Sequence, residues 1–410
     1  MKMLDVIVIG GGAAGMVAAI SSARKGAKTV IVERLPRVGK KILVTGNGRC
    51  NFSNTNLSKK KYHGTDPYFI GYTFSQFGSK QIIEFFEKLG ILHKVEDEEK
   101  VYPRCDQAGA VLDVLRYECQ RLVVEELCDR EVSAIVKEKD QFKLHIQNGE
   151  EYLCHSVIIT AGGKASPQFG SNGSGFELAS KLGHTIVEPF PSLVQIKLED
   201  EFLNHLNGIK VHARVSLYAN ESHIDTQEGE VLFAKYGMSG IPVLQLSRYV
   251  YHPELKGMEL ILHVDLFPEL QFHDLKKLIL ERFQKLHYKS IQDAMIGLIN
   301  KRMIHVILSI TTIDRDKLCG ELNSVEVDAL TNQLKDRRFK IKGTLSWRDA
   351  QVTAGGVATE EIDGKTLESK IVPGLFFAGE VIDIHGDSGG YNLAWAWASG
   401  YVAGMYAGKR

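Results

Sequence analysis

The residues best suited to chemistry lie near the two ends of the 410-residue chain. Close to the N-terminus, three glycines follow the spacing Gly-x-Gly-x-x-Gly directly after the apolar run Asp5–Ile9. Glycine at these positions lets the backbone turn tightly and approach a pyrophosphate, whose charge the N-terminus of the following helix stabilises. A purely structural turn is the alternative. The spacing predicts phosphate contacts from Gly10, Gly12, Ala13, Ala14 and Gly15.

Two further runs extend this nucleotide site. Glu33 follows the apolar run Thr29–Val32, near the offset at which an acid binds the ribose of a dinucleotide. An acid rather than an arginine at this offset favours FAD or NAD over NADP. The expected strand Leu127–Val136 is of the kind that contacts adenine through its backbone, and Val132 is the candidate residue. The end of the apolar run Ser156–Thr160 predicts contacts from Ala161, Gly162 and Gly163.

The segment that follows Glu33 is rich in glycine, asparagine and basic residues. A plain surface loop is one interpretation. The other is a loop wrapped over a second part of the cofactor, because close backbone approach needs glycine and polar ligand edges need donors. Lys40, Lys41 and Arg49 could also supply charge to a phosphate or to a reduced ring. The expected contacts come from Arg34, Lys40, Lys41, Thr45, Gly46, Asn47, Gly48, Arg49, Cys50 and Asn51.

A third group of residues follows the buried run Gly374–Ala378 near the C-terminus, where glycines precede a helix expected from about Leu393 to Tyr406. A helix N-terminus there would stabilise the negative charge that accumulates near N1 and C2=O of a flavin as it accepts a hydride. NAD develops no such anion, so this feature favours FAD. The expected contacts from this segment are Gly379, Glu380, Asp383, Gly389, Gly390, Tyr391, Asn392 and Leu393, and Gly355 in the earlier run Ala350–Val357 is expected near the ring.

Three side chains are candidates for catalysis. Cys50 could act as a thiol, although a small polar filler in a tight loop explains it equally well. His385 and Asp387 could handle protons near the ring, or could only cap the helix and line the turn. Tyr236 could face a substrate cavity, or could be a core aromatic at the end of a strand.

The elements that position these residues predict an α/β fold with a Rossmann-like parallel sheet assembled from both chain ends. Expected helices in the first part are Met16–Lys25, Phe69–Leu89, Val111–Glu126 and Phe176–Leu182, with a hairpin-like pair at Leu127–Val136 and Phe142–Gln147. The middle changes to short strands with polar turns at Val194–Leu198, Ala213–Ala219, Val231–Tyr236 and Met258–Val264. Helices are expected there at Ile241–Tyr251, Gln271–His287, Asp293–Leu308 and Ser324–Lys335. The predicted domains are residues 1–191, an insertion at 192–342, and residues 343–410.

Bulk composition narrows the class of partner. Lysine plus arginine equals aspartate plus glutamate at 50 each, so no overall field attracts nucleic acid or an acidic membrane. The basic run Lys335–Lys342 reads as a solvated helix end and strand edge. Six cysteines are scattered without metal-site spacing, and no apolar run reaches the roughly 18 residues of a membrane span. We expect a cytoplasmic protein with no metal, no nucleic-acid partner and no membrane contact.

Several of these motifs together resemble one family. The opening VIVIGGGAAG, the loop TGNGRCNFSN, the segment TAGGKASP with GSNGSG, the turn QVTAGGV, and GLFFAGEVIDIHGDSGGYNLAWAWASGYVAG are similar to the BaiN/YhiN-like bacterial NAD(P)/FAD-dependent oxidoreductases, also called aminoacetone oxidase-like flavoproteins. The resemblance implies a two-dinucleotide-binding-type domain that holds FAD non-covalently, and an inserted β-barrel with helices. It also implies either reduction of a conjugated C=C bond in an oxo-steroid or oxidation of an aminoketone.

Three functions therefore remain open. The first is a reductase in which NAD(P)H transiently reduces FAD and a small organic substrate, of the enone type, is then reduced. Because Gly170–Gly175 has its glycines in the order G-x-x-G-x-G after a Pro-containing loop, we expect no separate NAD(P) domain. The second is an O2-using oxidase of an aminoketone or amine. The third is a flavin-binding redox sensor or an RNA-associated flavoprotein, which neutral charge and the lack of interleaved aromatic and basic residues argue against. The sequence does not predict the oligomeric state.

Overall fold

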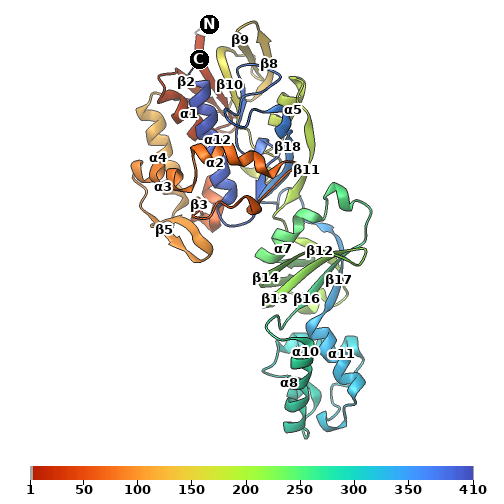
Figure 1. Cartoon of the computed structure of the whole chain (residues 1–410). Coiled ribbons are helices and arrows are strands. Elements are labelled where there is room, and N and C mark those ends of the chain that lie inside the picture. The colour runs from red at the N-terminus through yellow and green to blue at the C-terminus, as the bar shows by residue number, and fades with distance from the viewer. Residues whose placement is uncertain (1–2, 410) are drawn as a thin grey trace. The chain divides into compact units, whose positions relative to one another are not determined.

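The computed structural model describes residues 3–409, and the chain divides into two compact units (Figure 1). Unit 1 is Met1–Pro191 with Ala350–Arg410, and unit 2 is Ser192–Asp349. Residues 1, 2 and 410, which the expected domains include, lie outside the described residues. The expected boundary after residue 342 is wrong, because it falls within strand β17 (Arg337–Thr344), which closes the barrel of unit 2.

Unit 1 is built on a seven-stranded sheet in the order β7-β2-β1-β10-β9-β8, with β19 also paired to β10. The C-terminal strand β19 runs parallel to β10, with Val157 opposite Leu375, so both chain ends contribute to one sheet. The central strands are buried on both faces, which explains their uninterrupted apolar sequences. The strands are β1 (Met3–Ile9), β2 (Thr29–Val32), β7 (Glu125–Leu127), β8 (Val132–Glu138), β9 (Gln141–Ile146), β10 (Glu151–Ile159) and β19 (Leu375–Phe377).

Helices α1 (Ala13–Ala23) and α12 (Tyr391–Ala407) pack closely in unit 1 through a stripe of small residues. A Cβ added at Gly400 would lie 3.1 Å from the Cα of Ala14, and one at Gly404 would lie 2.8 Å from the Cα of Ala18. The residue numbers of the facing positions increase together along both helices, so the helices run parallel. Gly400 faces Ala14, and it lies nine residues after the start of α12, whereas Ala14 lies one residue after the start of α1. At about 1.5 Å per residue, the N-terminus of α12 therefore extends about 12 Å beyond that of α1.

Three of the elements expected in the rest of unit 1 differ from the structure. The expected helix Phe69–Leu89 is two helices, because Phe77 leaves helical geometry and Gly78 caps the second helix. The expected helix Val111–Glu126 ends at Arg121, and the expected strand Leu127–Val136 is divided between β7 and β8. The elements are α2 (Ile70–Gln76), α3 (Ser79–Lys88), α4 (Ala108–Arg121), α5 (Ser174–Lys181), β3 (Ser53–Asn54), β4 (Tyr62–His63), β5 (His93–Glu96), β6 (Lys100–Pro103), β11 (Ile186–Ser192), β18 (Val352–Val357) and β20 (His385–Gly386).

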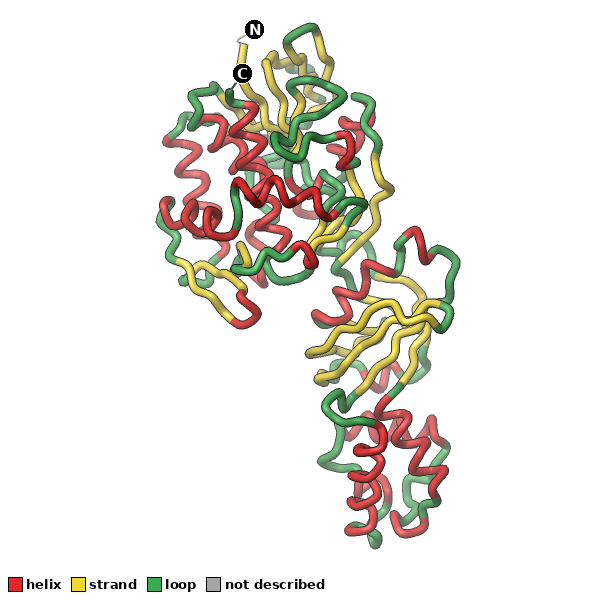
Figure 2. Tube along the Cα trace, viewed as in Figure 1, coloured by secondary structure: helices red, strands yellow, loops and turns green. Residues whose placement is uncertain are grey.

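Unit 2 contains a closed barrel in the order β12-β15-β14-β13-β16-β17 and a group of helices with its own apolar core (Figure 2). The expected helix Asp293–Leu308 is wrong, because the chain turns between two separate helices, α9 (Ile291–Ala294) and α10 (Lys301–Thr311). The expected helix Ile241–Tyr251 ends at Leu246, and the strand expected at Val231–Tyr236 is the end of the longer β14. The elements are β12 (Ile196–Glu199), β13 (Lys210–Ala219), β14 (Ser222–Ala234), β15 (Gly237–Ser239), β16 (Leu260–Asp265), α6 (Leu203–Leu206), α7 (Ile241–Leu246), α8 (Phe272–Lys285), α9 (Ile291–Ala294), α10 (Lys301–Thr311) and α11 (Ser324–Lys335).

Candidate flavin site

The glycine loop between β1 and α1 forms an open cradle in unit 1. Gly10 has φ +99°, and a Cβ there would lie 2.8 Å from the Cα of Ala161 at the end of β10. A Cβ at Gly15 would lie 2.7 Å from the Thr160 hydroxyl oxygen and would overlap the carbonyl of Gly10. By contrast, a Cβ at Gly12, the N-cap of α1, would meet nothing within 4 Å. Open space beside the first N–H groups of a helix fits a pyrophosphate.

Glu33 lies beside this cradle. One carboxylate oxygen accepts the N–H of Gly11 at 2.7 Å, and the other accepts the N–H of Leu35 at 2.9 Å. Burial raises the pKa of Glu33, and the two backbone hydrogen bonds act in the opposite direction. The backbone that pairs with Glu33 is that of Leu127 and Arg130, whereas Val132 pairs with Ile146 within the sheet. Leu127 ends β7 and Arg130 lies between β7 and β8, and the adenine contact of Val132 stays a prediction.

The ends of β10, β18 and β19 are joined by side chains that the sequence predicted only in part. Glu380 accepts the Lys41 ammonium at 2.9 Å and the N–H of Thr353 at 2.8 Å. The Thr353 hydroxyl in turn accepts the N–H groups of Lys164 and Ala165, which follow Ala161, Gly162 and Gly163. Lys41 is thus paired with a carboxylate of the protein. Sequence reasoning missed Thr353, because a threonine in an apolar strand carries no signal.

The loop predicted to wrap the cofactor is a distorted helical turn, Ile42–Gly48, with positive φ at Gly46 and Asn47. It contacts the closing helix: the side-chain oxygen of Asn51 accepts the N–H of Gly390 at 3.1 Å, with the amide oriented to donate to Ser53 and Val101. Asn54 donates to the carbonyl of Gly389 at 3.1 Å. The loop and the C-terminal segment therefore form one wall.

In this loop Arg49 is ion-paired within the protein and Cys50 is buried. Arg49 was expected to supply charge to a ligand, but it pairs with Glu96 (2.5 Å) and Asp106 (2.7 Å) and lies over the ring of Tyr102. The hydrogen bond with Glu96, followed by that with Asp106, raises the pKa of Arg49. Cys50 is buried, and burial raises the pKa of its thiol to about 12. A catalytic thiolate is thereby disfavoured, and the small polar filler is the better description of Cys50.

The closing segment contains the expected helix N-terminus. Gly389 and Gly390 both have positive φ, and α12 begins at Tyr391. The first N–H groups of the helix, from Tyr391, Asn392 and Leu393, lie beyond the reach of its own carbonyls. Asp383 was expected to contact the cofactor, but one of its oxygens accepts both the N–H (2.9 Å) and the hydroxyl (2.6 Å) of Thr65.

His385 and Asp387 lie together with a residue that the sequence did not single out. Strand β20 pairs with β4, which puts His385 opposite His63 with their rings 5.4 Å apart. The His63 imidazole meets the Asp387 carboxylate at 2.8 Å. The two residues are separated by 324 positions, so no spacing in the sequence could reveal the pair.

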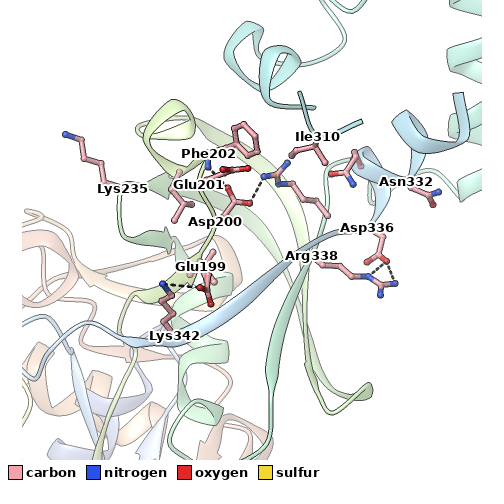
Figure 3. A pocket seen from close by; sticks show the side chains of 14 residues that line it. Glu199, Asp200, Glu201, Phe202, Lys235, Ile310, Asn332, Asp336, Arg338 and Lys342 are labelled. Carbon is pink, nitrogen blue, oxygen red and sulfur yellow. Dashed lines mark hydrogen bonds and ion pairs between the residues drawn. The ribbon is translucent and has the colours of Figure 1, made fainter. Parts of the chain in front are cut away.

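A cavity of about 1030 Å³ lies in unit 2 between the barrel and the helices (Figure 3). Six of its charged side chains form three ion pairs: Lys342 with Glu199 and Arg338 with Asp336 (Figure 3), and Arg337 with Asp200. Within residues 3–409, no group of three or more His, Cys, Asp or Glu side chains could hold a metal ion. No helix in that range is long and apolar enough to cross a membrane.

Comparison with known proteins agrees with this architecture. Residues 4–406 match the family described as HI0933-like protein Rossmann domain. The chain is 37% identical over 405 residues to the 3-dehydro-bile acid delta(4,6)-reductase of Clostridium scindens, with 98% of each chain covered. It is 30% identical over 403 residues to the ribosomal RNA dihydrouridine synthase of Escherichia coli, covering 98% of this chain and 97% of the other. A solved flavocytochrome c3 fumarate reductase has a TM-score of 0.48 at 17% identity, covering 100% of this chain and 78% of that one.

The chain belongs to the HI0933-like Rossmann family, which is the family that its motifs resemble. It is accordingly an FAD-dependent oxidoreductase, and the predictions of fold class and enzyme class are confirmed. The assignment of individual residues to FAD stays a prediction. The open cradle at Gly12 and the two aligned helix N-termini fit that cofactor.

Proposed function

We propose that the chain catalyses FAD-dependent reduction of a C=C bond conjugated to a carbonyl in a small organic substrate, with NAD(P)H as the transient electron donor. The observation that carries the proposal is the relative named as a delta(4,6)-reductase of a 3-dehydro-bile acid, which matches this chain over 98% of both lengths. Dihydrouridine synthase, the name of another full-length relative, denotes the same change of bond, since the C5=C6 bond of uridine is conjugated to a carbonyl.

The residues of unit 1 divide the task into binding and charge stabilisation. Bound FAD, once reduced by NAD(P)H, would supply a hydride to the carbon β to the carbonyl. The N-terminus of α1 at Gly12 would hold the pyrophosphate, and Glu33 would bind the ribose. The first turn of α12, about 12 Å further along, would stabilise negative charge on the ring. The ion-paired Lys41 and Arg49 would fix the loop that covers the cofactor.

No separate domain is proposed for NAD(P)H. The second glycine segment, Gly170–Gly175, folds back on the end of β10, since the N–H of Gly173 donates to the carbonyl of Gly163 at 3.0 Å. Both glycines belong to the edge of a single sheet. We therefore expect NAD(P)H and the substrate to take turns at the same face of the flavin, which predicts ping-pong kinetics.

A second candidate substrate is a uridine in ribosomal RNA. Two full-length relatives carry that name, and unit 1 exposes Lys59, Lys60 and Lys61 near the exposed rings of Tyr68 and Tyr72. The Lys59 ammonium lies 5.4 Å from the centroid of the Tyr68 ring. Lysines beside exposed aromatic rings suit single-stranded RNA, whose phosphates and bases they can contact. Lys59, Lys60 and Lys61 together with Tyr68 and Tyr72 thus place basic and aromatic side chains on one exposed segment of the chain.

Anaerobic stopped-flow measurements would test both candidates. The protein is reduced with NADH or NADPH and then mixed with a 3-oxo-4,6-diene steroid, with a uridine-containing rRNA fragment, or with O2. Rapid reoxidation by the steroid and slow reoxidation by O2 support the proposed function. Reoxidation by RNA alone, lost in a Lys59→Glu/Lys60→Glu variant, would support the second candidate. Slow reduction by both nucleotides, or reoxidation by O2 alone, would contradict the reductase.

A further inference from the structure

The pair formed by His63 and Asp387 has the geometry of a proton-holding group. The carboxylate side chain of Asp387 is 7% exposed and lies 2.8 Å from the imidazole, which is 27% exposed. The second carboxylate oxygen lies 3.4 Å from the ammonium of Lys61. A nearly buried carboxylate that orients a partly exposed imidazole lets the imidazole exchange protons with water while its position stays fixed.

The backbone around the pair is held rigidly. The N–H of Asp387 donates to the carbonyl of Lys61 at 2.9 Å, next to the pairing of β4 with β20. The side chain of Asn392 donates to the carbonyls of Gly386 and Asp387 and accepts the N–H of Gly386. Asn392 is in the first turn of α12, so the pair is tied directly to the helix N-terminus proposed to face the flavin ring.

Three titratable side chains near His63, those of Tyr62, Tyr391 and Asp383, are poorer proton donors or are already engaged. Burial raises the pKa of the Tyr62 and Tyr391 hydroxyls, and Tyr62 donates to the carbonyl of Tyr391 at 3.0 Å. Asp383 accepts two hydrogen bonds from Thr65. The charged or titratable side chains that contact His63, its strand neighbours or Asp387 include Lys61, Tyr62, Asp383, His385 and Tyr391.

We propose that His63, positioned by Asp387, takes up one proton when the flavin is reduced and delivers it to the substrate. This inference rests on the proposed function, because reduction of a conjugated C=C bond consumes a hydride and a proton. The hydride brings both electrons to the β-carbon, and the π electron pair moves onto the α-carbon and the carbonyl oxygen. The imidazolium N–H bond then breaks and a C–H bond forms at the α-carbon. The neutral imidazole takes its next proton from water when the flavin is reduced again. Asp387 acts as a positioning residue.

A redox titration of the FAD-bound protein tests the uptake of the proton without any substrate. The pH dependence of the midpoint potential should correspond to two protons per two electrons in the wild type, one carried with the hydride and one at His63. In His63→Gln it should correspond to one. Asp387→Asn keeps the size of the side chain and should show the same loss. His93→Gln is the matched control, since His93 meets Glu87 at 2.8 Å with 29% exposure but lies on β5.

The two half-reactions test delivery of the proton. With a 3-oxo-4,6-diene steroid as the probe, His63→Gln should be reoxidised about 10²- to 10⁴-fold more slowly than the wild type. Its reduction by dithionite and its affinity for FAD should be unchanged. If His63→Gln and Asp387→Asn keep the two-proton dependence, or if the steroid reoxidises them at the wild-type rate, the role of His63 is refuted. A different result is that the steroid does not reoxidise the wild type, while the pH dependence of the midpoint potential still falls to one proton in both variants. In that case the proposed substrate class is wrong and proton uptake at His63 is retained.

Discussion

The close packing of α1 against α12 predicts that Gly404→Ala destabilises the protein. In an exposed helix this substitution would stabilise by about 1 kcal/mol, because alanine has the higher helix propensity. Here the new Cβ would overlap the carbonyl oxygen of Ala18 and lie 2.8 Å from its Cα. These are backbone atoms, so no side chain can rotate away and the helices must separate. Overpacking of this kind costs about 1–3 kcal/mol, and the gap opened along the interface forfeits further dispersion contacts.

We therefore expect a net loss of about 2 kcal/mol in the free energy of unfolding. Urea unfolding of the FAD-free protein measures it, since bound FAD would add its own stabilisation. The FAD dissociation constant should also rise, because the substitution displaces both helix N-termini. Gly109→Ala in α4 is the matched control: its Cβ would meet nothing within 4 Å, so it should stabilise by about 0.5–1 kcal/mol. Equal or greater stability of Gly404→Ala would refute the packing explanation.

Three further outcomes can be measured. Asp200→Asn should lower the free energy of unfolding by about 3–5 kcal/mol, because it leaves the buried guanidinium of Arg337 without its carboxylate. Thermal unfolding measures this loss, and an unchanged melting temperature would contradict it. Burial lowers the pKa of His184, whereas the unfolded chain takes up the proton at about 6.5, so stability should fall as pH drops below that value. The melting temperature between pH 5 and 8 should vary less in His184→Gln. Dithionitrobenzoate should label the exposed Cys105 in the native protein but reach Cys50 only after unfolding, as mass spectrometry can verify.

The fold was readable from the sequence wherever one local pattern ran without interruption. The strand Thr29–Val32 and the helix Ser324–Lys335 have the bounds that were predicted. The helix begins after Asn323, whose side chain caps it. The expected helix Asp293–Leu308 failed because apolar spacing continues across the turn at Gly297, where φ is +83°.

The candidate site was readable only where a residue's role depends on its own backbone. The type and spacing of Gly10, Gly12 and Gly15 are enough to predict a tight turn. The role of Arg49 depends on Glu96 and Asp106, which lie 47 and 57 positions away and can be recognised only in the folded chain. The same holds for His63, whose partner comes from the opposite end of the chain. Propensity and spacing describe local structure, whereas these pairs are set by tertiary packing.

The pairing of β11 with β18 explains how a cofactor site can be assembled across an insertion. Ala358 donates its N–H to the carbonyl of Thr185, and a Cβ at Gly355 would lie 2.6 Å from the carbonyl oxygen of Glu188. The residue number in β18 rises as that of its partner in β11 falls, so the two strands are antiparallel. The chain therefore leaves unit 1 beside the point at which it returns. Residues 192–349 are in this sense a long loop between two paired strands. The two segments that form the candidate site can therefore keep their register whatever the insertion contains, because the sheet and the α1–α12 interface fix it within unit 1.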